Sequence, residues 1–402
     1  MLELEEAVVR ILAAVPSARR ETVSLEDANG RVLLEPVSSP IDLPAFDNSA
    51  MDGYALRAED VVAAKVDAPI RLHLIGRVVA GETFQDEVKR GTCVRLFTGS
   101  PMPKGADSVV MQEDIRSEPD KPGEIIVLEA VRAWENVRFR GEDVRSGTCL
   151  AKAGQILNAG RLSLLAATGA HEVTVGRQPN VGLISTGSEL KEPGQRLGPG
   201  QIYESNRIGL GALIRDTGSK PSIFPPVPDK PEATEQAILQ AFKECDIVVT
   251  TGGASVGELD LVRSSFARLG GEIEFWKVAI KPGRPFMFGR LGTQLLFGLP
   301  GNPVSALVTF LLLVRPALLR MQGANEVELP AVMGILAEGL SNPGSRRHFV
   351  RVSIDAAGKV SLAGSQASHL LLSFAAANGL VDVPPLCSLA VGSSVLVKRW
   401  AL

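Results

Sequence analysis

The chain has 402 residues and a formal net charge of −3, with 42 lysines and arginines against 45 aspartates and glutamates. One hydrophobic core rarely serves a chain of this length, so we expect two to four domains. The balance of charge excludes a protein whose overall field attracts nucleic acid, so any anion must be bound by a local group of cations and backbone N–H groups.

The chain carries no recognisable targeting or membrane segment. Residues 1–10 are acidic and amphipathic, without the basic start and apolar core of a signal peptide. The longest apolar stretch, Val304–Val314, is interrupted by Ser305 and Thr309 and is too short to span a bilayer. The four cysteines are far apart, which favours reduced thiols over a zinc or redox motif. We expect a cytoplasmic protein that binds neither nucleic acid nor membrane.

The first part of the chain predicts a helix followed by a β-rich insertion. Apolar residues recur at helical spacing from Leu4 to Val15, and Pro16 ends this pattern. Short β-like runs such as 70–79 and 108–112 then alternate with turns rich in proline and glycine. A second apolar helix is expected at about 159–168.

From about residue 178, strands and helices alternate. Strands are expected at 181–185, 221–224, 246–250, 273–280, 286–289 and 294–298, and helices at 208–214, 233–243, 259–269 and 304–321. Pro316 should bend or end the last helix. This alternation is typical of an open, mostly parallel sheet covered on both faces, which binds ligands at the carboxyl ends of its strands.

After about residue 326 the helical periodicity nearly vanishes. Strands at 349–354, 359–363, 379–383 and 394–398 predict a small C-terminal β barrel or sandwich. The expected fold class is multidomain α/β plus β. The expected domains are 1–45 with 141–177 (helical and extended), 46–140 (inserted, β-rich), 178–325 (α/β) and 326–402 (C-terminal β barrel).

Three loops rich in Gly, Ser and Thr follow strands of the α/β region, at 186–189, 250–257 and 299–305. Glycine lets a backbone approach a ligand, and successive N–H groups can form a nest for an anion. Each loop alone is explained by a tight turn, but three at one sheet edge predict a phosphate or oxyanion site. The candidate binding residues here are Thr186, Gly187, Gly252, Gly253, Ser255, Gly257, Pro300, Asn302, Pro303 and Ser305.

The last loop leads into a helix. Asn302 is placed as an N-cap and Pro303 as the first helical residue, so the free N–H groups of the helix would face an anion. None of the three loops has the P-loop or G-x-G-x-x-G pattern, which disfavours a nucleoside triphosphatase or a nicotinamide enzyme.

Cations and carboxylates accompany these loops. Lys277 and Lys281 are four residues apart in an expected strand and should share a face, and Arg284 follows a Pro-Gly turn. An edge strand with protective lysines explains the same pattern. Glu189 and Asp260 lie beside the loops and suggest Mg²⁺ shared with phosphate oxygens, although acids near helix starts are also common.

Other catalytic patterns are missing. The four histidines show no metal-ligand spacing, so we expect structural or surface roles for them. No G-x-S-x-G elbow occurs, so a hydrolase triad is not indicated.

Four motifs together resemble the molybdopterin molybdenumtransferase family, which includes the C-terminal domain of gephyrin. They are FDNSAMDGYA at 46–55, TGGASVG at 251–257, KPGRP at 281–285 and LPGNPVS at 299–305. The resemblance covers nearly the whole chain. It implies an elongated homodimer of four-domain subunits whose α/β domain has the molybdopterin-binding fold. The implied reaction inserts molybdate, a co-substrate, into adenylylated molybdopterin, with Mg²⁺-dependent hydrolysis that releases AMP.

The resemblance also implies roles for single residues. Asp52 and Thr98 match motifs of the β insertion that closes over the site. Glu189 and Asp260 match the acids associated with Mg²⁺, and Asp229 matches a further functional acid. The residues that match contacts to pterin phosphate or molybdate are Lys277, Lys281, Arg284, Ser305, Arg351 and Ser368.

The chain departs from the family pattern at three positions. Ser188 stands where many relatives have Asp, Arg284 stands where Lys is common, and Leu261 replaces a frequent Tyr. Two alternatives stay open: a molybdopterin adenylyltransferase on the same α/β fold, and a non-catalytic scaffold. The β modules and the Asp52 motif argue against the first, and the retained acids and cations argue against the second. The resemblance allows a molybdopterin adenylyltransferase and molybdoenzyme chaperones as partners.

Overall fold

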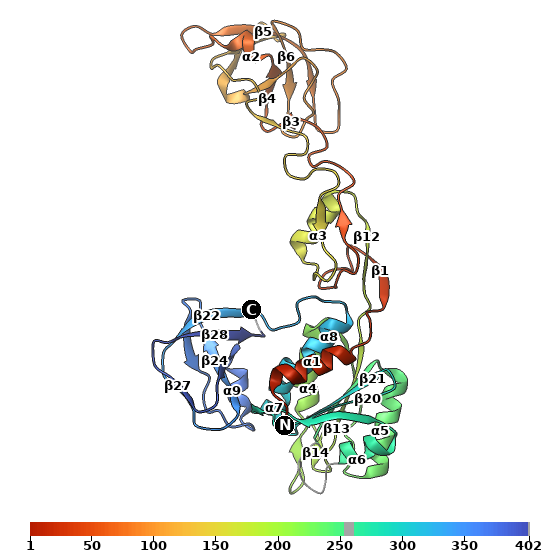
Figure 1. Ribbon diagram of the computed structural model, residues 1–402. Helices are drawn as coiled ribbons and strands as arrows, with labels where there is room; N and C mark the ends of the chain where they lie inside the picture. Colours follow the sequence, from red (N-terminus) through yellow and green to blue (C-terminus); the bar gives the residue numbers. More distant parts are fainter. Residues whose placement is uncertain (253–260, 401–402) are drawn as a thin grey trace. The chain divides into compact units, whose positions relative to one another are not determined.

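The structure, a computed structural model, describes residues 1–252 and 261–400 (Figure 1). The chain folds as two compact units. Unit 1 comprises Met1–Glu35, Ala153–Asn158 and Glu172–Leu402, and unit 2 comprises Pro36–Lys152 and Ala159–His171. Unit 2 is therefore inserted into the chain of unit 1.

Unit 1 contains a six-stranded α/β sheet. Its strand order is β16 (Lys220–Ile223), β13 (Asn180–Ser185), β17 (Ile247–Thr251), β21 (Gln294–Leu299), β20 (Pro285–Leu291) and β18 (Glu272–Lys277). The first four strands are parallel. β20 is antiparallel to β21, and the edge strand β18 is antiparallel to β20, so β20 alone runs against the other strands of this sheet. The near-continuous apolar runs of β13, β17 and β21 suit strands that are buried on both faces.

Helices cover both faces of this sheet. One face packs against α1 (Leu4–Ala14), α4 (Asn206–Asp216) and the long helix after β21 in the largest hydrophobic core. The other face packs against α5 (Pro231–Glu244) and α6 (Leu261–Arg268) in a second core. The expected mostly parallel α/β domain is confirmed.

The long helix after β21 continues through Pro316. It consists of α7 (Pro303–Thr309), a π-helical segment η2 (Phe310–Val314) and α8 (Arg315–Met321), with Pro316 in the first turn of α8. Of the two effects expected of Pro316, an end of the helix is not observed, because the wider π turn before the proline accommodates its missing N–H group and its ring. By length and composition this helix could cross a membrane, but most of it is buried in the core of unit 1.

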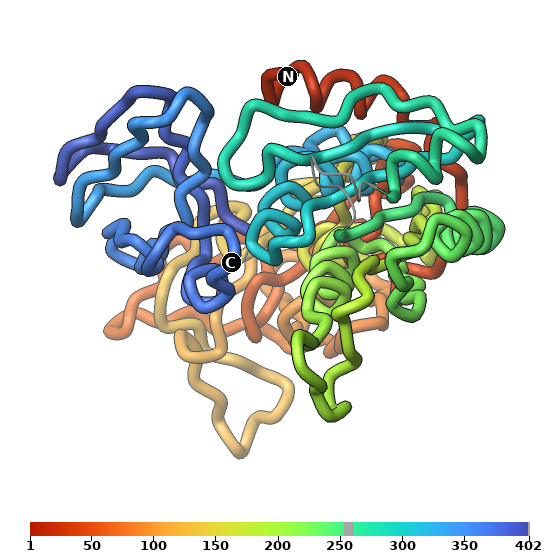
Figure 2. The backbone as a smooth tube through the Cα atoms, turned by 90° about the horizontal axis from the view of Figure 1, so that it is seen from below, coloured from red at the N-terminus to blue at the C-terminus, as the bar shows by residue number. Residues whose placement is uncertain are grey.

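The C-terminal part of unit 1 is a closed barrel. Its strands are β24 (Arg347–Ile354), β25 (Lys359–Leu362), β22 (Ala331–Leu336), β28 (Ser394–Arg399) and β26 (Gly379–Val383), and β26 pairs back with β24. The short strand β19 (Ile280–Lys281) adds to β24, and α9 (Leu371–Ala375) precedes β26. Both views show the blue barrel beside the green α/β sheet (Figures 1 and 2). The expected C-terminal barrel is confirmed.

Short strand pairs complete unit 1. They are β1 (Arg20–Ser24) with β12 (Glu172–Gly176), β14 (Leu190–Lys191) with β15 (Ile202–Tyr203), and β23 (Leu340–Asn342) with β27 (Cys387–Leu389).

Unit 2 is built around a second six-stranded sheet, as the β-rich sequence predicts. The order is β7 (Ser108–Met111), β4 (Gly53–Leu56), β6 (Thr92–Leu96), β5 (Ile70–Val78), β9 (Glu124–Val127) and β8 (Ile115–Ser117). Two short pairs are β3 (Asn48–Ser49) with β10 (Val137–Arg138), and β2 (Val37–Ser38) with β11 (Cys149–Ala151). The helical segments of unit 2 are α2 (Ala58–Val61), η1 (Gln112–Asp114) and α3 (Ala159–Ala167).

Candidate functional site

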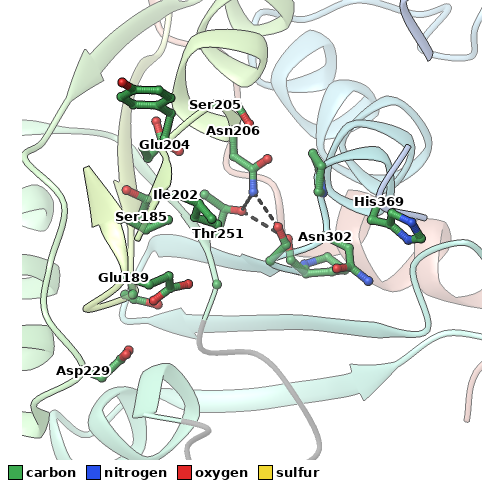
Figure 3. Close-up of a pocket in the computed structure, with 18 of the residues that line it drawn as sticks. Ser185, Glu189, Ile202, Glu204, Ser205, Asn206, Asp229, Thr251, Asn302 and His369 are labelled. Carbon is green, nitrogen blue, oxygen red and sulfur yellow. Dashed lines mark hydrogen bonds between the residues drawn. The ribbon is translucent and has the colours of Figure 1, made fainter. Parts of the chain in front are cut away.

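The loops after β13, β17 and β21 meet at one edge of the α/β sheet. The Thr186 N–H donates to the Thr251 carbonyl at 3.0 Å, and the Thr251 hydroxyl donates to the Pro300 carbonyl at 3.1 Å. The side-chain amide of Asn206, at the start of α4, donates to the Thr251 hydroxyl at 2.8 Å and to the Gly301 carbonyl at 2.9 Å (Figure 3). The predicted convergence of the three loops is therefore present in the described residues.

Gly252 explains why one of these loops needs glycine. Its φ of 87° lies in the left-handed region. A side-chain carbon at this position would overlap the carbonyl oxygen of Thr186. The loops can therefore pack this closely only because position 252 has no side chain.

The loops line a cavity of about 640 Å³, a size typical of ligand sites. Eight predicted binding or catalytic residues line it: Thr186, Gly187, Glu189, Asp229, Gly252, Pro300, Asn302 and Pro303. Four other predicted residues, Gly253, Ser255, Gly257 and Asp260, lie outside the described residues.

Sequence reasoning missed part of the lining. Tyr203, Glu204, Ser205 and Asn206 contribute from β15 and the start of α4, and His369 contributes from the segment before α9. Figure 3 shows Glu189 and Asp229 on one side of the cavity and Asn302 and His369 on the other. The one local signal for His369 is that it directly follows Ser368, a residue that the family resemblance predicts to contact pterin phosphate or molybdate.

The described lining is acidic. It contains Glu189, Glu204 and Asp229, and among the described lining residues no lysine or arginine occurs. Glu204 is buried and neutralised by Arg207, which donates its backbone N–H at 2.9 Å and its Nε at 3.1 Å to the two carboxylate oxygens. Glu189 and Asp229 therefore remain as the acids that face a ligand.

Asp229 is tied to the first loop. Its carboxylate accepts the Ser188 N–H at 3.0 Å, and its own N–H donates to the Ser188 hydroxyl at 3.0 Å. The Gly187 N–H donates to the Val227 carbonyl at 3.0 Å. These bonds hold the segment before α5 beside the loop that carries Glu189.

Asn302 occupies the N-cap position of α7 and Pro303 the first turn, as predicted. The Asn302 side chain does not cap the helix, however, and instead donates to the Ser368 hydroxyl at 3.0 Å. The Val304 N–H donates to the Ser368 carbonyl at 3.2 Å. The segment before α9 is thus fastened to the first turn of α7.

The predicted shared face of Lys277 and Lys281 is wrong. Lys277 ends β18 of the α/β sheet, whereas Lys281 lies in β19, which pairs with β24 of the barrel in the register Lys281 to His348. The ammonium group of Lys277 lies 3.6 Å from the ring centre of Trp276. The extended segment is broken at 278–279, so alternation along one strand does not apply, and neither lysine lines the cavity.

Arg284 and Ser305 also lie outside the lining. Arg284 follows β19, and its carbonyl accepts the Val278 N–H at 3.2 Å. Ser305 is buried in α7, and its carbonyl accepts the Thr309 hydroxyl at 2.8 Å.

Arg351 belongs to β24 of the barrel, and its side chain is fully buried against the segment before α9. Its Nε donates to the Ser373 hydroxyl at 2.9 Å, and its Nη2 donates to the carbonyls of Ser365 at 3.0 Å and Ala367 at 3.2 Å. Its Nη1 is buried without a partner among the described residues. Burial lowers the pKa of Arg351 to about 10. Arg351 thus supports the backbone that presents Ser368, and keeps one free donor.

Asp52 and Thr98 lie together in unit 2. One carboxylate oxygen of Asp52 accepts both the backbone N–H and the hydroxyl of Thr98, each at 2.8 Å. These two bonds hold the pKa of Asp52 below its usual value. The resemblance singled out both residues, and the structure places them in direct contact.

Three family descriptions match the chain. They are the MoeA N-terminal region (domain I and II) over residues 2–169, a probable molybdopterin binding domain over residues 182–320, and the MoeA C-terminal region (domain IV) over residues 333–400.

Known proteins are similar over nearly the full length. Molybdopterin molybdenumtransferase 2 of Mycobacterium tuberculosis (strain H37Rv) is 39% identical over 402 residues and covers 98% of each chain. The molybdopterin molybdenumtransferase of Haemophilus influenzae is 37% identical over 384 residues, 94% of this chain and 93% of the relative. The crystal structure of the molybdopterin biosynthesis moeA protein from Pyrococcus horikoshii OT3 matches all of both chains with a TM-score of 0.85 and 32% identity.

Proposed function

Because the chain belongs to the molybdopterin molybdenumtransferase family, we propose that it inserts molybdate into adenylylated molybdopterin and hydrolyses the phosphoanhydride to release AMP. Hydrolysis adds one water across the P–O–P bond, so AMP leaves with its phosphate and the pterin keeps its own. The reaction is Mg²⁺-dependent, with molybdate as co-substrate.

One observation carries this proposal: three glycine-containing loops meet around a cavity of ligand size at the carboxyl edge of parallel strands. Backbone N–H groups of such loops bind phosphate oxygens, and the first turn of α7 adds further donors. The cavity is large enough for a nucleotide-sized portion of the substrate.

The acidic lining fits a divalent cation. A phosphoanhydride facing Glu189 and Asp229 needs positive charge, and the described lining supplies no lysine or arginine. Mg²⁺ prefers oxygen ligands and is usually held by one or two carboxylates together with substrate phosphates. Glu189 and Asp260 would hold the ion, and when bound it offsets phosphate charge.

The chain's own groups would perform the remaining work. Glu189 is positioned by the loop that Ser188 and Asp229 hold. Ser368 is bonded to Asn302 at the start of α7, and Arg351, with its unpartnered Nη1, binds the neighbouring Ala367 carbonyl. We infer that these two residues bind molybdate together with Lys281, Arg284 and Ser305. Fixed donors of this kind replace the hydration of a tetrahedral dianion, which is costly to remove.

The decisive experiment replaces Asp260 with Asn and measures AMP release and molybdenum loading of molybdopterin. We expect both rates to fall, because the variant should lose about 2–4 kcal/mol of transition-state stabilisation. Wild-type rates for both would overturn the metal role.

Incubation with molybdopterin and ATP tests the adenylyltransferase alternative. Adenylylation without molybdenum insertion would favour that alternative, whereas matches to both MoeA end regions already argue against it. If the protein releases no AMP from adenylylated molybdopterin, the result would favour the alternative of a non-catalytic scaffold protein.

We further propose that the protein is a cytoplasmic homodimer. The resemblance supports the dimer, and full-length similarity to biosynthetic proteins supports the location. Sedimentation equilibrium gives the oligomeric state, and a monomeric mass at micromolar concentration would contradict the dimer.

A further inference from the structure

A second cavity lies within unit 1, away from the three loops. It has a volume of about 190 Å³, equal to about six water molecules in the liquid. It is formed by the end of α4, the junction of η2 and α8, the segment before β22, and the end of β28. Its lining residues are Leu213, Asp216, Thr217, Leu311, Arg315, Leu329, Pro330, Arg399 and Trp400.

Two guanidinium groups in this lining, those of Arg315 and Arg399, are partly buried. Neither Arg315 nor Arg399 forms an ion pair with a described residue. Arg315 donates one Nη1 bond to the Val327 carbonyl at 2.8 Å, and burial lowers its pKa. The Nε of Arg399 is buried without a hydrogen-bond partner among the described residues.

Among the fully buried arginines of unit 1, two are ion-paired, whereas Arg351 is held by hydrogen bonds alone. Arg31 is paired with Glu21, and Arg207 is paired with both Glu204 and Glu192. Buried charges are normally paired, because an unpaired charge away from water is costly. Arg315 and Arg399 are partly buried, and two positive groups from separate elements at one small cavity make it a place that fits an anionic group.

The rest of the lining is apolar. Leu213, Leu311 and Leu329 are buried around the cavity. The Trp400 ring is stacked on Phe374, with the ring centres 4.8 Å apart and an interplanar angle of 12°. These groups favour a ligand with an apolar body and disfavour a strongly hydrated ion such as phosphate.

The charges of the lining select a monoanion. Arg315 and Arg399 contribute two positive charges and Asp216, which is exposed, contributes one negative charge, so the sum is +1. A planar carboxylate matches the fork of N–H donors that a guanidinium presents.

We propose that this second cavity binds a small organic monocarboxylate, with its carboxylate against Arg315 and Arg399 and its apolar body against the leucines and Trp400. The site is separate from the cavity of the three loops and does not depend on the proposed function. The volume limits the ligand to a molecule about the size of benzoate.

Benzoate is the probe, and benzamide is its neutral match. Isothermal titration calorimetry with the full chain should show saturable benzoate binding, with benzamide at least about tenfold weaker because it lacks the charge. Equal binding of the two compounds, or no benzoate binding up to about 10 mM, would overturn the proposal. Inorganic phosphate that competes as well as benzoate does would also overturn the assignment to a carboxylate.

Two variants with opposite expected effects locate the binding. Arg399→Gln should weaken benzoate at least about tenfold. Asp216→Asn removes the opposing charge and should strengthen binding about two- to fivefold. Arg290→Gln, an exposed arginine of β20, is the matched control and should leave affinity unchanged. If Arg399→Gln lowers the melting temperature too far for titration, Asp216→Asn decides. Unchanged affinity in Asp216→Asn would overturn the proposal.

The chain's own terminal carboxylate is the competing occupant. A chain extended beyond Leu402 by several glycine and serine residues separates the two. Unchanged benzoate affinity supports a free ligand, whereas clearly tighter binding to the extended chain would assign the cavity to the terminus and overturn the proposal.

Discussion

Ser188 and Asp229 hydrogen-bond to each other reciprocally: the Ser188 N–H donates to the Asp229 carboxylate, and the Asp229 N–H donates to the Ser188 hydroxyl, each at 3.0 Å. This pair joins the loop after β13 to the segment before α5. It fixes the backbone next to Glu189, which lines the cavity. Position 188 therefore tests how charge is arranged around the proposed phosphate site.

Replacing Ser188 by Asp should make the protein more dependent on Mg²⁺. The new carboxylate lies beside Glu189 and Asp229, so like charges repel until a cation binds. We expect the melting temperature without Mg²⁺ to fall by a few degrees, equivalent to about 1 kcal/mol, and to recover when Mg²⁺ is added. Thermal unfolding with and without Mg²⁺ measures this, with Ser188→Ala as control. A melting temperature that Mg²⁺ does not raise more than in the wild type would contradict the metal site.

Glu189→Gln should mainly reduce activity, whereas Glu204→Gln should mainly reduce stability. Glu189 faces the cavity, so its substitution should reduce AMP release by about 10²–10³-fold with little change in stability. Glu204 is buried against Arg207, so its substitution leaves a buried charge half-paired and should lower the free energy of unfolding by about 3 kcal/mol. Urea unfolding and AMP-release assays on both variants separate the two roles. Reversed results would show that Glu204 is the functional acid.

Gly252→Ala should disrupt the convergence of the loops. The added carbon meets the Thr186 carbonyl oxygen, and φ is 87°. Gly270 has a φ of 82° with open space around the same position, so Gly270→Ala measures backbone strain alone. We expect the free energy of unfolding to fall by about 1 kcal/mol in Gly270→Ala. In Gly252→Ala we expect it to fall by about 2–4 kcal/mol, with loss of activity. Equal effects on the free energy of unfolding would mean that the close packing does not matter.

Thr98→Val should raise the pKa of Asp52. Both bonds that Thr98 donates favour the ionised carboxylate, and valine removes the hydroxyl bond while keeping the backbone bond. The lowered pKa means that the stabilisation by this pair is present above the pKa of an unfolded aspartate and is lost as pH falls through the folded pKa. Carbon NMR titration of Asp52 measures the shift. Thr98→Ser should restore the wild-type titration, and an unchanged pKa in Thr98→Val would assign the effect to the backbone alone.

His348 should make the protein less stable in acid. Both ring nitrogens are buried without a partner among the described residues, and burial, together with the charges of Lys281, Arg351 and Arg346, lowers its pKa from 6.5 to about 4. Between these values the unfolded chain binds a proton that the folded chain does not, so stability falls as pH decreases from about 6.5 to about 4. The loss approaches about 3 kcal/mol at the acid end.

Urea unfolding at pH 7.5 and pH 4.5 checks this for the wild type and for His348→Leu. The variant keeps all other titrating groups, so the difference isolates the imidazole. Identical pH dependence in both proteins would show that His348 is protonated or solvated in the folded state.

Much of the fold follows from local patterns in the sequence. Runs of β-branched residues such as Ile247–Thr251 predict strands buried on both faces, and the glycines after them predict loops at the sheet edge. The N-cap position of Asn302 and the barrel strands near the C-terminus could be predicted for the same reason. These features depend on conformational preferences of a few neighbouring residues, which the sequence displays directly.

Only the tertiary structure decided which side chains share a site. Lys277 and Lys281 are separated because the chain passes from one sheet to another between them, and no local signal marks that change. The approach of Ser368 to Asn302 and the cavity that brings Arg315 beside Arg399 both depend on segments distant in sequence. Side-chain charge is encoded at each position, but its partner and its solvation arise only when distant elements pack together.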